Sequence, residues 1–367
     1  MILGSEAEAD RWARVAWSRI AEPQDAAVRD WIAAKGASAA LRDVVEGRVA
    51  RDGRYAARLA ELDLPGAVRA LDRHGYTVVV PGDAGWPDGV DLLRTPPLCL
   101  YVRGDADLAS LFERSVAVVG SRDCTDYGVQ VTAALASGLA NRNVCVVSGA
   151  AHGIDAAAHR SVLAAEGRTV AFLACGVDRV YPEAHRGMLA EIARTGAVVS
   201  EIPLGGAPFR LRFLARNRLI AAVTLGTVVV EASARSGSLN TARHARDLVK
   251  PVAAVPGPVT RMQSAGCHDL IRTKGASLVT DAAEVMDLMG RIGDDLAEVR
   301  RGPESTTDGL SPTALAVWAA VPVRRGVEVE VLARATALPS AAVAGALATL
   351  ELDGLVRRSP AGWSKAR

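Results

Sequence analysis

The chain has 367 residues, a formal net charge of +2 and an apolar fraction of 50%, a composition typical of a globular protein long enough for two or three domains. Aromatic residues make up only 4%, and 39 of the 43 basic side chains are arginine. The near-neutral balance does not by itself indicate a nucleic-acid partner. Between Gly205 and Lys250, however, eight basic residues stand against two acidic ones, a local net charge of +6.

The cysteines and the N-terminus indicate an intracellular protein. The five cysteines form no CxxC pair, so we expect reduced core thiols rather than disulfides or zinc ligands. The N-terminal MILGSEAEADRWARVAW lacks the regions of a signal peptide. No apolar run reaches about 18 residues, so we expect a cytoplasmic protein without a membrane span.

The first part of the chain, residues 1–75, predicts a small helical domain. Trp12, Val15 and Ile20 have helical spacing, and Gly75 is placed to end a helix. The Pro- and Gly-punctuated stretch that follows, up to about residue 105, predicts a strand, a loop and a second strand.

From Ser115 onward, short apolar β-branched runs alternate with stretches long enough for a helix. Strands that are apolar on both faces indicate a mostly parallel sheet covered on both sides. The sequence therefore predicts an α/β fold, an extended Rossmann-like, doubly wound domain over residues 76–290. Its expected strands are 115–120, 143–149, 169–175, 197–202, 226–233, 251–257 and 276–280.

The C-terminal part predicts a separate module. Residues 291–309 are polar, carry Gly and Pro, and read as a linker. Residues 310–367 predict three helices followed by a small hairpin, which together indicate a winged-helix domain.

Two strand–helix junctions predict anion-binding loops, because ligands of an open parallel sheet lie at the carboxyl ends of its strands. Gly120, Ser121 and Arg122 follow the first strand of the domain and either meet a phosphate or only make a tight turn. The second junction is neither GxGxxG nor a P-loop, so we expect no dinucleotide and no P-loop hydrolysis. It offers backbone amides and hydroxyls at a helix start, from Ser148, Gly149, Gly153 and Asp155.

A third junction, after the run 226–233, also begins a helix with small polar residues: Ser236, Gly237, Ser238 and Thr241. Glu231 at the end of this strand is either a general base or an acceptor that organises loop amides, and we favour the acceptor because no matched acid, nucleophile or metal is evident. His152, Asp155 and His159 have a spacing that suits a metal site, but no further cluster completes one, so we expect no metal.

The stretch RLRFLARNR places four arginines directly before an apolar run. Either they form a salt-bridged surface or they face phosphates, and Phe213 among them offers a ring on which a base can stack. We expect Arg210 and Arg212 to be exposed phosphate contacts. Arg216, Asn217 and Arg218 lie deeper in the helix, where the arginines also hold neighbouring loops.

In register, these motifs resemble the DprA/Smf family, the DNA-processing protein A family of bacterial natural transformation. The resemblance covers about residues 77–289, and the C-terminal module resembles the family's winged-helix appendage. Residues 1–75 resemble the family's helical SAM-like domain more loosely. The motifs that carry it are GSR (120–122), SGAAHGIDAAAH (148–159), YP (181–182), SEIP (200–203), FLARNRLIA (213–221), VVEAS and SGSLNTA (229–242), AVPG (254–257) and GCHDLIRTKGA (266–276).

The resemblance implies a non-enzymatic protein, without cofactor, that binds single-stranded DNA, dimerises and helps to load RecA recombinase. It assigns phosphate contacts to Arg122, the Ser148–Gly149 loop and the arginines of FLARNR, and a base contact to Phe213. Arg210 stands where the family suggests a lysine, which keeps the charge but changes the donor geometry. His185 and Arg186 replace a residue that is often Asn in the family, so no role is carried over for that loop.

Two alternatives remain open from the sequence. One is a nucleotide-binding enzyme of the phosphoribohydrolase type, although SGSLNTARHA lacks that family's glutamate. The other is a duplex-DNA regulator that uses the winged helix, for which Arg324, Arg325, Arg357 and Arg358 provide charge. The predicted helices of that module show no polar row suited to base edges.

Overall fold

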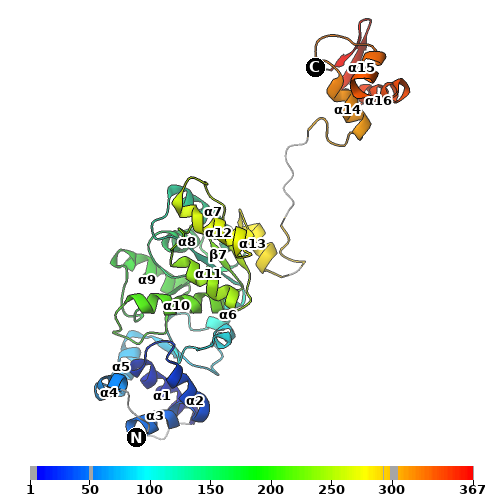
Figure 1. The fold of residues 1–367 in the computed structure, drawn as a ribbon. Helices are drawn as coiled ribbons and strands as arrows, with labels where there is room; N and C mark the ends of the chain where they lie inside the picture. Colours follow the sequence, from blue (N-terminus) through cyan, green and yellow to red (C-terminus); the bar gives the residue numbers. More distant parts are fainter. Residues whose placement is uncertain (1–5, 49–52, 292, 298–304, 367) are drawn as a thin grey trace. The chain divides into compact units, whose positions relative to one another are not determined.

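The structure is a computed structural model that describes residues 6–48, 53–291, 293–297 and 305–366. The chain divides into two compact units, Met1–Ala297 and Glu298–Arg367 (Figure 1). The helical part and the sheet part of the first unit pack as one body, so the domain limits that the sequence suggests inside it remain predictions.

The N-terminal part is helical, as the spacing predicts: its first four helices pack around one aromatic cluster, and the fifth packs with residues of the sheet. Trp17 is fully buried, with its ring 6.1 Å from that of Trp31 and 6.5 Å from that of Tyr55. Gly75 ends the last of these helices in the left-handed conformation, φ 64°. The helices are α1 (Glu6–Ile20), α2 (Ala26–Lys35), α3 (Ala37–Val45), α4 (Gly53–Ala60) and α5 (Leu64–His74).

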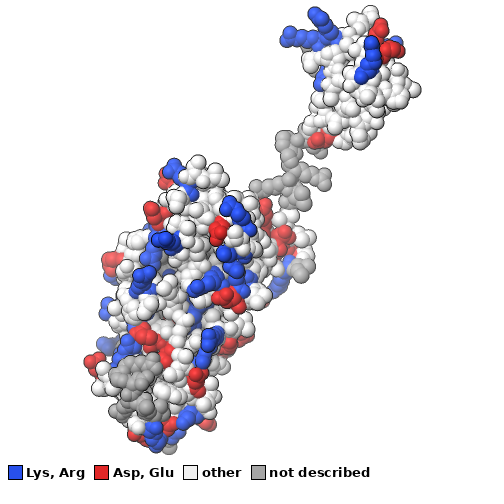
Figure 2. Space-filling view, viewed as in Figure 1, with Lys and Arg blue, Asp and Glu red and all other residues white. Residues whose placement is uncertain are grey.

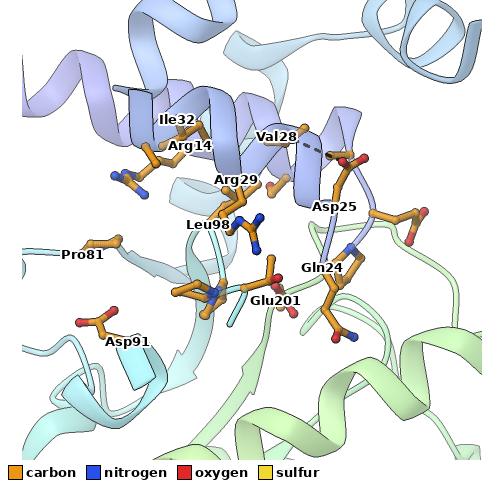
Figure 3. Close-up of a pocket in the computed structure, with 18 residues that line it drawn as sticks. Arg14, Gln24, Asp25, Val28, Arg29, Ile32, Pro81, Asp91, Leu98 and Glu201 are labelled. Carbon is orange, nitrogen blue, oxygen red and sulfur yellow. Dashed lines mark hydrogen bonds between the residues drawn. The ribbon is translucent and has the colours of Figure 1, made fainter. Parts of the chain in front are cut away.

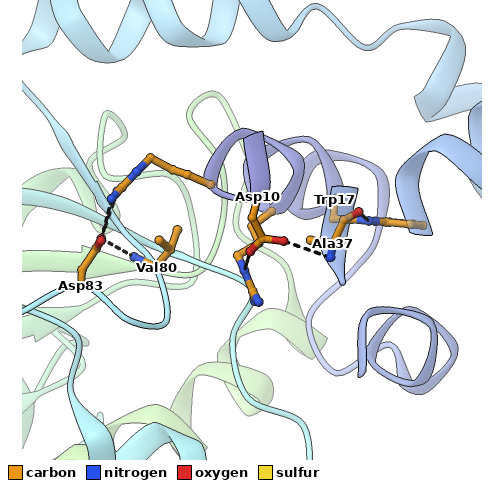
Figure 4. A network of polar contacts seen from close by, with 7 residues as sticks. Asp10, Trp17, Ala37, Val80 and Asp83 are labelled. Atoms are coloured by element: carbon orange, nitrogen blue, oxygen red, sulfur yellow. Dashed lines mark hydrogen bonds and ion pairs between the residues drawn. The ribbon is translucent and has the colours of Figure 1, made fainter. Parts of the chain in front are cut away.

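Polar contacts attach these helices to the first strands of the sheet (Figure 4). Arg11 donates two hydrogen bonds to Asp83, at 2.9 and 2.6 Å, and Asp83 accepts a third from the backbone of Val80. Ser18 and Tyr101 share a buried hydrogen bond of 2.7 Å between their hydroxyls. These bonds satisfy polar groups at the junction and fix how the helices lie against the sheet.

The sheet has nine strands in the order β1-β2-β6-β5-β4-β3-β7-β8-β9, and each of the seven predicted runs contains a strand. β1 (Thr77–Val79) and β2 (Leu100–Gly104) form an antiparallel edge, and β2 pairs antiparallel with β6. The other neighbours are parallel: β3 (Ser115–Val119), β4 (Cys145–Ser148), β5 (Thr169–Phe172), β6 (Ala197–Ser200), β7 (Thr227–Val229), β8 (Val252–Ala254) and β9 (Ser277–Leu278).

Helices cover both faces of this sheet, as its doubly apolar strands require. Ala117 and Val119 pack into one layer, and Val116 and Val118 into the other. The first layer includes α6 (Leu108–Glu113), α10 (Arg210–Val223), α11 (Ser238–Asp247) and α12 (Ala265–Thr273). The opposite side carries α7 (Asp126–Ala140), α8 (Ile154–Ala164), α9 (Arg186–Thr195) and α13 (Ala282–Met289).

The strand order reverses between β3 and β7. From β3 the chain moves outward through β4, β5 and β6, and then returns to β7 on the other side of β3. The loops that leave β3 and β7 therefore diverge and leave a crevice at the carboxyl ends of the strands, where open α/β sheets bind ligands.

The second unit consists of three helices and a hairpin, which confirms the predicted winged helix. Val327 forms an isolated antiparallel β-bridge with Trp363 and so places a third segment of chain beside the hairpin. The elements are α14 (Pro312–Ala320), α15 (Val329–Thr336), α16 (Ser340–Leu352), β10 (Val356–Ser359) and β11 (Gly362–Lys365).

All five cysteines are free thiols, and burial raises the pKa of Cys99 and of Cys145 to about 12. Across the described residues, no single helix has both the length and the apolar character needed to cross a bilayer. The α15–α16 pair meets that test of length and composition only when the two helices are taken together, across a bend of 108°.

Candidate nucleic-acid interface

An open groove of about 780 Å³ lies at the crevice between the β3 and β7 loops, with α10 as its third wall. It brings together most of the residues that the sequence singles out, although they come from four separate stretches of the chain. Those that line it are Gly120, Ser121, Arg122, Asp155, Arg210, Phe213, Arg216, Asn217, Ser236, Gly237, Ser238 and Thr241.

Glu231 connects the two loops that follow β3 and β7, at the point where the strand order reverses. Its carboxylate accepts hydrogen bonds from the backbone and the hydroxyl of Thr125, at 2.9 and 2.6 Å, and its carbonyl accepts one from the Ser121 backbone at 2.7 Å. Gly128 packs so tightly against this carboxylate that a Cβ there would collide with it. The structure thus gives Glu231 the acceptor role that the sequence analysis favoured.

Arg122 and two aromatic rings pack together beside the groove. The Arg122 guanidinium carbon lies 5.0 Å from the ring centroid of Phe213, and the ring of Tyr181 lies 5.6 Å from that of Phe213. Arg122 is exposed and the Tyr181 side chain is 47% exposed, so both reach solvent. Partly exposed aromatic rings next to a cation suit the stacking of a base.

Arg216 lines the groove, but most of its guanidinium is engaged in hydrogen bonds within the protein. It donates to the carbonyl of Gly149 at 2.7 Å and to that of Phe172, and it lies beside Asp155. Burial lowers the pKa of Arg216 to about 10, and burial raises the pKa of Asp155, although each charge favours the other. Arg216 therefore holds one loop carbonyl and the carbonyl at the end of β5, which agrees with the expectation that the deeper arginines hold neighbouring loops.

Arg212 and Arg218 do not line the groove. This differs from the expectation that Arg212 is an exposed phosphate contact, and from the phosphate contact that the resemblance assigned to Arg218. The Arg212 side chain is mostly buried and pairs with Glu22, 190 residues away in the chain, at 2.8 Å. Arg218 is fully buried and pairs with Glu201 at 2.6 Å. The physical reason is that acids distant in the sequence fold against α10 and neutralise these two side chains.

Both acids line a second, smaller cavity of about 210 Å³ between the N-terminal helices and the sheet (Figure 3). Its walls are mainly apolar, with Val28, Ile32 and Leu98 among them. Helix α10 thus has arginines on two sides: one set serves the groove, and the other holds the carboxylates of this cavity.

Ser148, Gly149 and Gly153 support the groove from beneath. The Ser148 hydroxyl is fully buried and donates to the carbonyl of Val118 at 2.7 Å. The Gly149 backbone donates to Asp155 at 3.1 Å, and Gly153 adopts a φ of 76° against the carbonyls of Ser121 and Arg122, where a Cβ would collide. Their polar groups already have protein partners, so they shape the loops.

The start of α11 presents small polar groups to the groove. The hydroxyls of Ser236 and Ser238 share a hydrogen bond of 2.8 Å, and the amide of Asn217 donates to the carbonyl of Gly237 at 3.3 Å. Asn240, which the sequence analysis did not select, also lines the groove, and its buried Oδ1 has no partner among the described residues. Such amide, hydroxyl and carbonyl groups can exchange hydrogen bonds with a polyanion or a base edge.

Among the other lining residues that were missed are two aromatic side chains, Tyr181 and Phe209, and one cation, Arg235. The Phe209 side chain is 40% exposed, and Arg235 is exposed. Arg122, Arg210 and Arg235 have no ion-pair partner in the part of the chain that the structure describes, whereas the wider surface mixes both signs of charge (Figure 2). Four arginines against two aspartates give the lining residues a formal charge of +2.

The histidines of the HxxDxxxH stretch have partners inside the protein. His159 is fully buried beside Thr169 at 2.8 Å, and burial lowers its pKa to about 3. Asp155 accepts from loop amides, and the ring of His152 packs against that of His185. Within the described ranges, no group of three or more His, Cys, Asp or Glu residues is arranged to hold a metal ion.

The fold is a Rossmann-like domain with a winged-helix appendage. Arginine and aromatic side chains line the groove at the carboxyl ends of its strands. Residues 77–290 match the family model described as DNA recombination-mediator protein A, and residues 301–362 match the DprA winged helix domain. The chain belongs to the DprA/Smf family of DNA-processing proteins.

Named relatives are similar to this chain over most of its length. A putative DNA processing protein DprA of Mycobacterium tuberculosis is 42% identical over 359 residues, which cover 94% of this chain and 92% of the relative. DprA of Streptococcus pneumoniae has a similar X-ray structure, with TM-score 0.64 and 30% identity over 77% of this chain and 98% of that one. DprA of Helicobacter pylori, whose structure describes a single-stranded DNA binding mode, has TM-score 0.52 and 30% identity, with coverage of 58% and 94%.

Proposed function

We propose that this protein binds single-stranded DNA in the groove between the β3 loop, the β7 loop and α10, without regard to sequence. The proposal depends mainly on one observation: three exposed, unpaired arginines lie around an exposed aromatic surface, namely Arg122, Arg210 and Arg235. Arginines neutralise phosphates, and rings accept any base because every base has a π face. The H. pylori relative's single-strand binding mode supports the same assignment.

Single strands fit this groove better than duplex or a small cofactor. In a duplex the flat faces of the bases are stacked and closed to Phe213 and Tyr181, whereas in a single strand they are accessible. A small cofactor would need an enclosed pocket, but this groove is open along α10.

We propose a non-enzymatic role for the groove. A phosphoribohydrolase needs a free carboxylate at the β7 edge, and both carboxylate oxygens of Glu231 already accept hydrogen bonds from Thr125. Release of free base from AMP at an enzymatic rate would overturn this proposal.

The test of binding is an anisotropy titration of a labelled oligo-dT strand and of the matching duplex, at two or more salt concentrations. We expect tighter binding of the single strand, and a slope of log K against log salt that falls by about 0.7 for each phosphate contact removed. Replacing Arg122, Arg210 and Arg235 together by alanine should weaken binding to all strands alike. Equal affinity of parent and triple variant at physiological salt would refute the site.

Membership of the DprA/Smf family supports three finer proposals: that the protein is cytoplasmic, that it dimerises, and that it helps to load RecA onto single strands during transformation or recombination. Light scattering at several protein concentrations tests the dimer. Loading is tested by the rate at which RecA forms filaments on strands coated with single-strand-binding protein, with and without this chain.

A second candidate function is binding of a nucleic-acid backbone by the winged helix. Arg324, Arg325, Arg357 and Arg358 are exposed on the hairpin and the adjoining turn, and blue side chains project from this unit in Figure 2. The exposed face of α16 carries Ala, Gly and Thr, whose side chains cannot make the paired hydrogen bonds by which proteins recognise the edge of a base. Replacing the four arginines by alanine should lower the affinity for duplex DNA and leave oligo-dT binding in the groove unchanged.

A further inference from the structure

We infer that Glu22, a residue of the N-terminal helical part, positions the entry of α10 and thereby holds Phe209 and Arg210 in the DNA groove. This inference rests on the proposed single-strand binding. It gives the N-terminal helices a part in binding although none of their described residues lines the groove.

The entry of α10 lacks the usual side-chain cap. Its N-cap residue is Phe209, with extended backbone angles and no side-chain hydrogen bond to the first turn. An uncapped first turn leaves backbone amides without a partner and frays readily. Something other than a cap must therefore fix the direction in which Phe209 and Arg210 leave the helix.

Arg212 supplies that restraint. Its Nη1 donates to the carbonyl of Ala207, outside the helix, at 2.8 Å, and its guanidinium carbon lies 4.3 Å from the ring centroid of Phe209. One side chain thus ties the segment before the helix to the first helical turn and covers one face of the Phe209 ring.

Glu22 in turn fixes Arg212. The Nε and Nη2 of Arg212 donate to the two carboxylate oxygens of Glu22, at 3.0 and 2.8 Å, in a bidentate pair. Arg58 donates to the same carboxylate at 2.5 Å. Burial acts against the charge of Glu22, but the bonds from Arg212 and Arg58 outweigh it and lower the pKa of Glu22. The carboxylate therefore stays charged and holds the guanidinium at neutral pH.

Two readings of Arg212 predict opposite results. In the first case, Arg212 is able to contact a phosphate and Glu22 only neutralises it. Glu22→Ala then frees the cation, so the single-strand affinity rises and its salt dependence becomes steeper. If Glu22 acts by positioning, Glu22→Ala loosens the helix entry and affinity falls. We expect a loss of roughly 2- to 10-fold, the range set by ordering a side chain at an interface. The salt slope stays unchanged, because no phosphate contact is removed.

The experiment is oligo-dT anisotropy on the full chain at several salt concentrations for Glu22→Ala, Arg212→Gln and the double variant, each with a thermal melt. We expect the double variant to bind as weakly as either single variant, since both break one connection. Arg58→Gln is the matched control: it removes the other guanidinium from Glu22 but none from α10, and its affinity should equal the parent's.

Failure of this inference and failure of the proposed function give different patterns. Tighter binding by Glu22→Ala, additive losses in the double variant, or an equal loss in Arg58→Gln would overturn the positioning role. The proposed groove would still stand if Arg122→Ala weakened binding with a reduced salt slope. If neither Arg122→Ala nor Glu22→Ala changed affinity, the groove itself would be wrong.

Discussion

The guanidinium of Arg122 covers the ring of Phe213, with 5.0 Å between the guanidinium carbon and the ring centroid. Tyr181 packs on the same ring from another loop, 5.6 Å between centroids. A base that stacks on Phe213 must share this surface with Arg122, so the cation is positioned to meet the phosphate attached to that base.

This relationship separates a stacking contribution from a charge contribution. Phe213→Leu should cost about 1–3 kcal/mol of single-strand affinity, the usual cost of losing one stacked base, and leave the salt slope unchanged. Arg122→Ala should lower the salt slope by about 0.7. Anisotropy at four salt concentrations measures both quantities, and a changed slope in Phe213→Leu would contradict the assignment.

Arg218 should matter for stability rather than for DNA. It is buried, paired with Glu201, and its Nε and Nη1 have no partner among the described residues. Arg218→Ala leaves the Glu201 carboxylate buried without its cation, at a cost of about 3–5 kcal/mol in the free energy of unfolding. Urea unfolding measures this cost, and exposed Arg210→Ala, which should change it by less than about 0.5 kcal/mol, is the control.

Glu231→Gln should loosen the two loops that follow β3 and β7. A glutamine amide presents a donor where the carboxylate accepts from Thr125, so one buried bond is lost and one donor is left unsatisfied. We expect about 1–3 kcal/mol less stability, together with weaker oligo-dT binding. Thermal unfolding and anisotropy test this; unchanged stability would show that the tie between the loops is not needed.

The pair of Arg114 and Asp295 should make stability depend on acid. Their side chains bond at 2.9 and 2.6 Å, and the bond from Arg114 lowers the pKa of Asp295 from 3.8 to about 2. A lowered folded-state pKa contributes stability that is complete above the unfolded value and is lost as the pH falls toward the folded one. The difference in melting temperature between the parent and Arg114→Gln should therefore be constant above pH 5 and shrink below pH 4. A difference that stayed constant down to pH 3 would contradict this assignment.

Sequence patterns predicted the fold because its determinants are local. Strands buried on both faces read as continuous apolar runs, and each run from Ser115 onward contains a strand. The Gly75 helix end and the three-helix hairpin module follow from equally local signals. The lining of the groove by Gly120, Ser121 and Arg122 follows from the rule that strand ends carry the site.

The sequence divided the arginines of α10 by role only in part: it expected Arg210 to be exposed and Arg216 to hold a loop, but it did not find the ion pairs of Arg212 and Arg218. Their nearest carboxylates, Glu22 and Glu201, reach them only through tertiary packing, and no local spacing announces those pairs. Tyr181 was missed for a similar reason: it is a single ring in a loop, and only the fold brings it to Phe213. Phe209 and Arg235 carried local signals that were overlooked, since Phe209 lies three residues before Arg212 and Arg235 is a charged residue in the loop after β7.

The Arg114–Asp295 pair also decides where this chain can be cut. The last helix on the sheet, α13, ends at Met289, and the family model ends at residue 290. A fragment that stopped there would lose Asp295, whose side chain is only 9% exposed, and would leave Arg114 at the end of α6 without its carboxylate. A fragment that carries the sheet should therefore extend to Ala297, the last residue of the first unit.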